Sequence, residues 1–177
     1  MIVGGSGRAA AGPGLLRGLA PVLGAAPRLL ILGSFPGEVS LSQARYYAHP
    51  RNQFWPILGG LLGEPLPELD YEARLERLRV RRVALWDVLG ACRRTGSLDA
   101  AIRDAHGNDF DALLAGLPGL GAVAFNGATA ARSEPAFAAR GLVTYRMPST
   151  SPAHAALSFE AKLERWMALR TDGWIAA

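Results

Sequence analysis

The sequence predicts an α/β fold, a three-layer α/β/α sandwich with a central, mostly parallel four-stranded sheet. Four short apolar runs are bounded by turn residues, and the first three are almost continuously apolar, which is typical of strands that helices cover on both faces. These strand candidates are residues 28–33, 82–89, 122–127 and 142–148. Helical patterns alternate with them, at residues 52–62, 70–82, 108–117 and 158–170. Such alternation favours a parallel sheet.

Residues 1–27 are rich in Gly, Ala and Pro, and they predict a loosely ordered N-terminal extension that ends in one packed turn or short helix. Residues 28–177 are expected to form a single domain, because a chain of 177 residues that is half apolar can bury a sizeable core. No apolar run approaches the roughly 20 residues of a membrane span. The single Cys92 excludes an intramolecular disulfide and favours a reducing, cytoplasmic setting. We expect a monomer that does not bind membranes.

Each helical segment has its own signal. The first can begin after Asn52, provided that Pro56 falls in its first turn, where proline is tolerated. The second has leucines three residues apart, with arginines on the other face. The third begins with Asn108 as its cap, and the fourth begins with Ser158 as its cap and carries an apolar stripe.

The net charge of +4 comes almost wholly from arginine, because Lys162 is the only lysine among nineteen basic residues. A GC-rich coding sequence and selection for phosphate contacts explain this bias equally well. The arginines of residues 74–82 fit a solvated helix face. Arg93 and Arg94 follow the end of a strand, where a phosphate contact is more plausible.

Ligands of parallel sheets bind at the carboxyl ends of the strands, so the segments that follow the four strands should converge on one rim. These segments are residues 33–40, 87–97, 125–131 and 148–155. Asp87 interrupts a buried strand at this end. Burying an ionisable group there costs free energy unless the group has a bonding partner or a functional role. Residues 148–152 combine two prolines with three hydroxyls, which suits either a phosphate contact or a helix-capping loop.

Several other kinds of site are excluded or weakly supported. The three histidines are scattered and no His-x-Glu accompanies a Cys-x-x-Cys, so neither a metal site nor a zinc deaminase is predicted. The turn at residues 33–37 lacks the spacing and the lysine of a triphosphate-binding loop. Ser34 directly follows Gly33, which does not fit the nucleophile elbow of a serine hydrolase. A tight strand-to-helix turn also explains these glycines.

Taken together, the motifs resemble the uracil-DNA glycosylase superfamily, most closely its hypoxanthine-DNA glycosylase branch. The matching segments lie within residues 29–155, and they read "LILGSFPGEVSL", "YYAHPRNQFW", "ALWDVLGACRRTGSLDAAI", "FNG" and "PSTSPAHA". The resemblance implies a monofunctional DNA glycosylase, associated with the nucleoid, that flips a deaminated base out of DNA and hydrolyses its N-glycosidic bond in base excision repair. The base would be hypoxanthine, uracil or both, and no cofactor is implied.

The resemblance also implies roles for individual residues. Asn52 and Ser149 are the catalytic candidates. Other branches of the superfamily hold the attacking water with Asp or Asn at the position of Phe35. A phenylalanine side chain cannot hold this water, so the resemblance implies that Asn52 takes over the role. Ser149 lies where relatives place His or Asn near the leaving base, and Tyr47 lies where related enzymes stack an aromatic ring on the base. The base-binding candidates are Gly33, Ser34, Phe35, Tyr47, Asp87 and Asn126. The DNA-binding candidates are Pro36, Gly37, His49, Arg51, Arg93, Arg94, Thr150, Ser151, Pro152 and His154, of which His154 is the candidate wedge.

Two alternative functions remain open. Because Phe35 removes the superfamily's commonest water holder, the chain can be a DNA-binding module that kept the fold without the chemistry. It can also be a glycosylase chiefly specific for uracil or xanthine. A nucleoside hydrolase is disfavoured because its cluster of metal-binding aspartates is absent.

Overall fold

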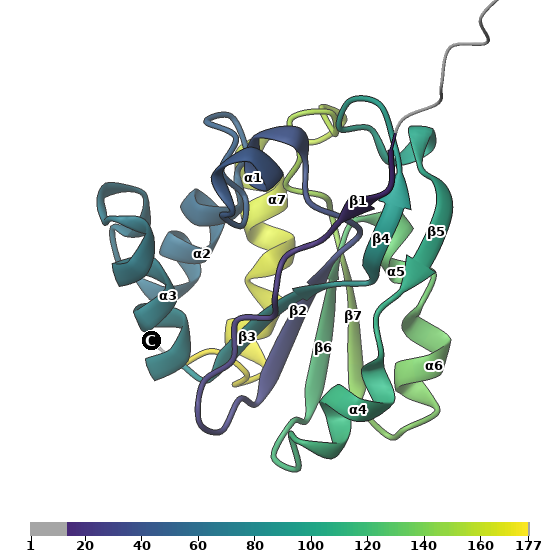
Figure 1. The fold of residues 1–177 in the computed structure, drawn as a ribbon. Coiled ribbons are helices and arrows are strands. Elements are labelled where there is room, and N and C mark those ends of the chain that lie inside the picture. Colours follow the sequence, from purple (N-terminus) through teal and green to yellow (C-terminus); the bar gives the residue numbers. More distant parts are fainter. Residues whose placement is uncertain (1–13, 177) are drawn as a thin grey trace, which may run out of the picture.

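A computed structural model describes residues 14–176 of the chain (Figure 1). Its central sheet is four-stranded and parallel, in the order β3-β2-β6-β7. The strands are β2 (Leu29–Gly33), β3 (Val83–Asp87), β6 (Ala122–Asn126) and β7 (Val143–Met147). Every residue of β2 and β6 is buried, which explains their unbroken apolar sequences, whereas β7 lies at an edge and is largely exposed or half-buried.

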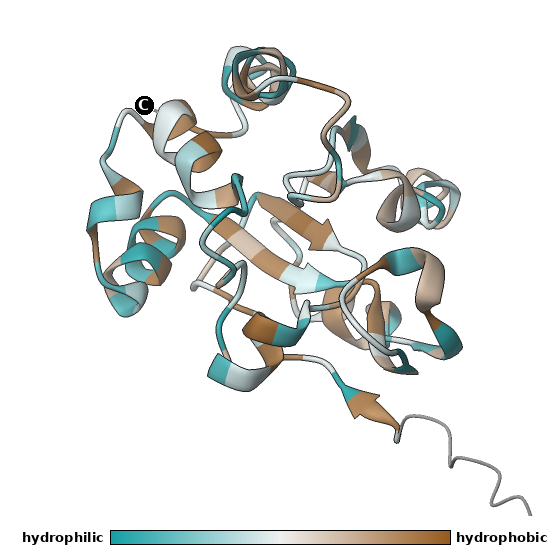
Figure 2. Cartoon of the chain, turned by 90° about the horizontal axis from the view of Figure 1, so that it is seen from above, coloured by the Kyte–Doolittle hydropathy of each residue, from teal (hydrophilic) through white to brown (hydrophobic). Residues whose placement is uncertain are grey.

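Helices cover both faces of this sheet, so the predicted three-layer α/β/α sandwich is confirmed (Figures 1 and 2). Alternate residues of β2 face opposite layers: Leu29 and Ile31 join one buried cluster, and Leu30 and Leu32 join the other. The first layer contains α2 (Phe54–Leu62), α3 (Tyr71–Val80) and α7 (Phe159–Trp166). The second layer contains α4 (Phe110–Ala115), α5 (Ala128–Ala131) and α6 (Glu134–Ala138).

A second, antiparallel sheet was not predicted. It has the order β1-β4-β5 and consists of β1 (Leu16–Arg17), β4 (Leu89–Arg93) and β5 (Arg103–Gly107). The predicted strand at residues 82–89 ends early, at Asp87. Val88 and Leu89 donate backbone hydrogen bonds to the carbonyls of Gly33 and Ser34, and these bonds redirect the chain into β4. Five residues of the segment that follows Asp87 thus form a strand of the second sheet.

The N-terminal prediction is wrong for residues 14–27, and residues 1–13 lie outside the described part of the chain. The expected turn or helix is an extended segment: β1 pairs with β4, and Val22 exchanges two backbone hydrogen bonds with Leu85 of β3. β3 is an edge strand of the central sheet, so its exposed backbone groups need partners. The segment supplies them, and it buries Val22 in the core.

The helix boundaries differ from the predictions by a few residues. α2 begins at Phe54 with Pro56 in its first turn, and the side chain of Ser158 caps α7 as expected. α4 is capped by Asp109, because the side chain of Asn108 instead donates a hydrogen bond to the carbonyl of Asp87. Short helices complete the fold: α1 (Glu38–Gln43), α8 (Ala168–Thr171) and the 3-10 turns η1 (Leu66–Glu68) and η2 (Asp99–Ala101). Within residues 14–176, no helix has both the length and the apolar character needed to cross a membrane.

Candidate active site

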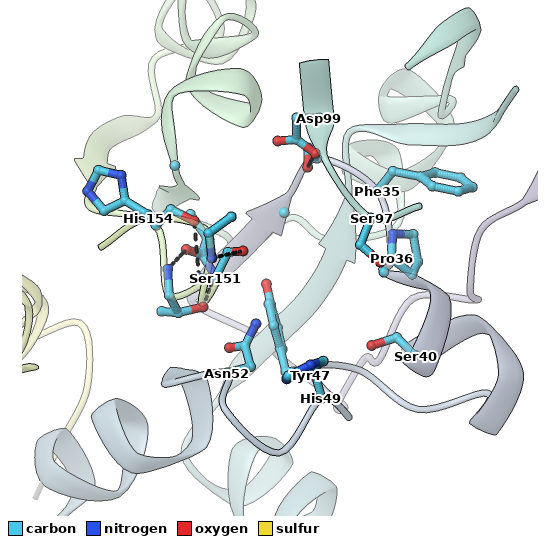
Figure 3. A pocket seen from close by; sticks show the side chains of 18 of the residues that line it. Phe35, Pro36, Ser40, Tyr47, His49, Asn52, Ser97, Asp99, Ser151 and His154 are labelled. Atoms are coloured by element: carbon cyan, nitrogen blue, oxygen red, sulfur yellow. Dashed lines mark hydrogen bonds between the residues drawn. The ribbon is translucent and has the colours of Figure 1, made fainter. Parts of the chain in front are cut away.

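A cavity of about 340 Å³ opens at the carboxyl ends of the parallel strands. All four segments that follow these strands line it, so the predicted convergence on one rim is confirmed. The sequence-predicted residues in its wall are Gly33, Ser34, Phe35, Pro36, Gly37, Tyr47, His49, Asn52, Asp87, Asn126, Ser149, Thr150, Ser151, Pro152 and His154. Figure 3 shows how several of these side chains surround the open space.

The ends of β2 and β3 lie side by side, which places Gly33 next to Asp87. A Cβ atom on residue 33 would lie 2.5 Å from Oδ1 of Asp87 and 3.2 Å from the hydroxyl of Tyr47. Only glycine leaves room for both polar groups at this point. The hydroxyl of Tyr47 and Oδ2 of Asp87 are buried and have no hydrogen-bond partner among residues 14–176, so both have unused capacity for a ligand.

Asp87 is only 4% exposed. Burial raises its pKa to about 7; the negative charge of Asp99 raises it too, and the guanidinium of Arg94 opposes the shift. Near neutral pH the group therefore exists in both forms. The ionised form accepts hydrogen bonds, and the protonated form can also donate one.

The raised pKa of Asp87 predicts a pH-dependent stability. Between pH 4 and pH 7 the folded chain binds more protons at Asp87 than the unfolded chain does, so the free energy of unfolding falls as the pH rises through this window. From pH 5 to pH 8 we expect wild-type stability to fall by about 2–3 kcal/mol more than that of Asp87→Asn. Urea unfolding of both proteins at the two pH values measures this difference, and equal falls would contradict the assignment.

Tyr47 is held from the side of the core. Its backbone is left-handed, with φ 54°, and its ring stacks on Phe54 with 3.8 Å between ring centroids and 15° between planes. Phe54 in turn makes edge contacts with Trp55 and Trp166. Burial raises the pKa of Tyr47 above its ordinary value. The ring is therefore a rigid, neutral wall of the cavity.

Asn52 lies beside Tyr47, and both side chains face the open space (Figure 3). Its Oδ1 accepts a hydrogen bond of 2.9 Å from the backbone N–H of Phe54, which fixes the orientation of the carboxamide. The side chain is half-buried. An oriented amide at this place can hold a water molecule or a ligand atom in a defined position.

The loop after β7 is tied to the central sheet by Asn126. The side chain of Asn126 donates to Oγ1 of Thr150 and accepts from its backbone N–H, both at 2.9 Å. Asn126 and Thr150 are buried, so this pair holds the loop in place. Oγ of Ser149 accepts a hydrogen bond from the N–H of Ser151, which leaves the Ser149 hydroxyl proton available to a ligand.

Lys162, the only lysine of the chain, joins the two sides of the site. Its Nζ donates to Oε1 of Gln53 at 2.9 Å and to the carbonyl of His154 at 2.7 Å. Gln53 also donates its backbone N–H to the carbonyl of Thr150. The buried ammonium thus links the residue after Asn52 to the loop that carries Ser149.

Comparisons with known proteins identify the family of this chain. The family model described as the Uracil DNA glycosylase superfamily matches residues 21–170. The chain belongs to this superfamily. It is 38% identical over 161 residues to the hypoxanthine DNA glycosylase of Methanosarcina barkeri strain Fusaro, covering 91% of this chain and 96% of the relative. The hypoxanthine DNA glycosylase of Methanosarcina acetivorans is 39% identical over 153 residues, or 86% of this chain and 96% of that protein.

A solved structure of a superfamily member has the same fold. It is a solution NMR structure from Methanosarcina acetivorans, described as a candidate uracil DNA glycosylase. Its TM-score is 0.81 and its sequence is 37% identical, with 89% of this chain and 98% of that chain covered.

Three arginines expected at the DNA surface of this superfamily member do not line the cavity: Arg51, Arg93 and Arg94. Arg93 is exposed and forms an ion pair with Asp104 at 3.1 Å. Arg94 is only 3% exposed, and its Nη2 donates to the carbonyl of Pro36. A guanidinium that is buried in this way cannot reach a phosphate, so the prediction for Arg94 is wrong.

Phe35, a base-binding candidate, lines the cavity, and its contact with the base stays a prediction. Its ring is buried and turns away from the cavity (Figure 3), and the Arg94 guanidinium lies 5.1 Å from the ring centroid. The position that holds a polar residue in other branches of the superfamily therefore serves packing here. Burial of both the ring and the guanidinium stabilises the turn after β2.

Sequence reasoning missed one wall of the cavity. Ser97, Leu98 and Asp99 line the cavity although they come after β4, and Oδ1 of Asp99 accepts a hydrogen bond of 2.7 Å from the hydroxyl of Ser34. The available signal was the pair of polar residues Ser97 and Asp99, which follow Gly96 within the matching segment. The other lining residues not predicted are Val39, Ser40, Tyr46, Gly127, Ala128, Thr129 and Ala153.

Proposed function

We propose that this chain is a monofunctional DNA glycosylase that takes a deaminated base, hypoxanthine or uracil, into the cavity and hydrolyses its N-glycosidic bond in base excision repair. The observation that carries the proposal is the buried carboxylate of Asp87, whose Oδ2 lacks a partner among residues 14–176, in a cavity that Asn52 and Tyr47 also line. Membership of the superfamily and two relatives named hypoxanthine DNA glycosylase support it.

Hydrogen bonding at one base edge explains the choice of substrate. Hypoxanthine and uracil present an N–H beside a carbonyl, whereas adenine and cytosine present a bare ring nitrogen beside an amino group. Ionised Asp87 accepts from the N–H, and backbone amides of the turn from Gly33 to Gly37 donate to the carbonyl. With adenine the carboxylate meets another acceptor, and each buried group left unpaired costs about 1–3 kcal/mol.

Catalysis rests on positioning and on oriented dipoles. Cleavage of the glycosidic bond places positive charge on the sugar and negative charge on the departing base. Asn52 is neutral, so it orients the attacking water and turns its amide dipole toward the sugar cation, in the carboxamide position that its bond to Phe54 fixes. Ser149 donates its hydroxyl proton to the departing base in a hydrogen bond.

Base release from defined duplexes tests the proposal. Duplexes with one inosine, uracil or xanthine are incubated with excess protein, and alkali then cleaves the abasic sites. We expect single-turnover cleavage of inosine and uracil substrates and no cleavage of undamaged DNA. Binding without cleavage of any base would instead identify a non-catalytic DNA-binding module. A much faster rate on uracil or xanthine than on inosine would change the assigned substrate.

Tyr47→Ala tests the base-stacking role. We expect it to weaken binding of an inosine duplex by about 5- to 100-fold, because stacking of one base on an aromatic ring contributes about 1–3 kcal/mol. Binding is measured in an Asn52→Ala background, so that the substrate stays intact. Tyr47→Phe is the matched control because it keeps the ring. An equal loss of affinity for undamaged duplex would remove the stacking role.

A further inference from the structure

The second sheet carries several cations on one face. Residues that lie directly opposite each other in antiparallel strands project from the same face. Arg17 of β1 and His106 of β5 both lie opposite Ala91 of β4. Arg93, two positions further along β4 and so on the same face as Ala91, lies opposite Arg103. The basic face formed in this way comprises Arg17, Arg93, Arg103 and His106, and all four residues are exposed.

A β-bulge brings two of these arginines together. The pairing advances two residues along β4, from 91 to 93, but three residues along β5, from 106 to 103. A regular ladder would place Asp104 opposite Arg93, and the extra residue places Arg103 there instead. Asp104 has a left-handed backbone at the bulge, with φ 46°. Bulges re-aim side chains and are common next to active sites.

The basic face has an excess of positive charge. Like charges directly opposite each other destabilise a sheet, so an anion close to both Arg93 and Arg103 would stabilise it. Asp104 forms an ion pair with Arg93 at 3.1 Å, and it is the one carboxylate within the three strands, all of which the structure describes. The guanidinium of Arg103 donates to the carbonyls of Ala100 and Ile102, which orients the group without neutralising it. The face is therefore suited to an anionic partner.

The basic face adjoins the mouth of the cavity. Arg93 ends β4 and Arg103 begins β5, and the segment between them supplies residues 97–99 to the cavity wall. Hydrogen bonds with Glu38 and Ser34 hold this segment against the chain that follows β2. The second sheet lies beside the carboxyl ends of the parallel strands (Figure 1). A nucleotide in the cavity stays joined to its strand through phosphates, so this strand has to leave along a surface next to the mouth.

We propose that the basic face binds phosphates of the duplex on one side of the deaminated base. This inference rests on the proposed glycosylase function. Guanidinium groups form bidentate hydrogen bonds with phosphate, so arginine suits this contact. Phosphate contacts fix the position and register of a protein on DNA without reading its sequence. The basic face thus sets which flank of the deaminated base the protein covers, and the cavity selects the base.

The salt dependence of affinity tests this contact. Fluorescence titration with a labelled inosine duplex gives the Kd between about 50 and 200 mM salt, in the Asn52→Ala background that keeps the substrate intact. For the triple variant Arg17→Gln, Arg93→Gln and Arg103→Gln, we expect the slope of log Kd against log salt concentration to fall by about 1 for each arginine. Arg103→Lys keeps the charge and should keep most of the slope. Arg165→Gln, which removes an exposed arginine from α7, is the matched control and should leave the slope unchanged.

Asp104→Asn should act in the opposite direction. Asparagine tolerates a left-handed backbone, so the bulge should persist in this variant. Removing the carboxylate takes away the group that competes with phosphate for Arg93, so affinity should rise and the slope should steepen by up to about 1. This gain does not depend on whether the arginine variants fold normally. Weaker or unchanged binding by Asp104→Asn would contradict the proposal.

Shortened duplexes locate the contact. Two duplexes keep a long flank on only one side of the inosine, and we expect the triple variant to bind more weakly than its parent on one of them alone. Equal slopes for the triple variant and its parent on the full duplex would overturn the proposal, as would an equal loss on both shortened duplexes. Absence of base release by the wild-type protein, with these salt and flank effects intact, would contradict the glycosylase function and leave the basic face as a DNA-binding surface. Failure of the parent protein to bind DNA would overturn both.

Discussion

Replacing Asn52 with alanine is expected to slow single-turnover base release by about 100- to 1000-fold, the usual effect of removing one preorganised dipole from an active site. Affinity for an inosine duplex should change little, because the cavity floor at Asp87 and the ring of Tyr47 remain. Alkali-revealed cleavage gives the rate, and a fluorescence titration with labelled duplex gives the affinity. Normal single-turnover rates in this variant would remove Asn52 from the mechanism.

A matched variant separates the chemical role of Asn52 from its local structural role. The same side chain accepts the N–H of Phe54 at the start of α2, so the alanine variant also loses a hydrogen bond there. Asn52→Ser keeps an acceptor for this N–H but has no amide. We expect it to recover stability in urea unfolding while staying as slow as the alanine variant. Recovery of the rate by serine would show that only the local bond matters.

Replacing Gly33 with alanine is expected to slow base release by about 100-fold, because displacing a positioned group by roughly 1 Å has an effect of this size. The new Cβ would lie 2.5 Å from Oδ1 of Asp87 and 3.2 Å from the hydroxyl of Tyr47, so the carboxylate has to move away from the base edge. Overpacking of this kind also destabilises the fold by about 1–3 kcal/mol.

Two controls identify the clash as the cause. A Cβ on Gly119 would lie 3.9 Å from the carbonyl of Pro27, an ordinary contact, so Gly119→Ala should keep the wild-type rate. In an Asp87→Ala background the Gly33→Ala change should add little further loss, since the displaced carboxylate is already gone. Fully additive losses, or a wild-type rate for Gly33→Ala alone, would contradict the geometry.

Local patterns identified the central sheet because its strands carry their signal in a few consecutive residues. β2 and β6 are apolar throughout and fully buried. β5 was missed because all five of its residues are exposed and polar or small, so backbone pairing with β4 rather than burial holds it in the sheet. The extended N-terminal segment was missed for a related reason. Backbone pairing with an edge strand holds it in place, and the composition of the segment gives no signal of that pairing.

The sequence by itself determined the parallel sheet, the turns at the carboxyl ends of its strands and most of the residue types at the cavity, because strand propensity and turn chemistry act over a few neighbouring residues. The tertiary structure alone decided which side chains meet. Ser34 and Asp99 bond across 65 positions, and Gln53 and Lys162 across 109. It also buried Arg94 and left Leu98 in water. Such outcomes depend on how distant segments close on one another, which no local pattern encodes.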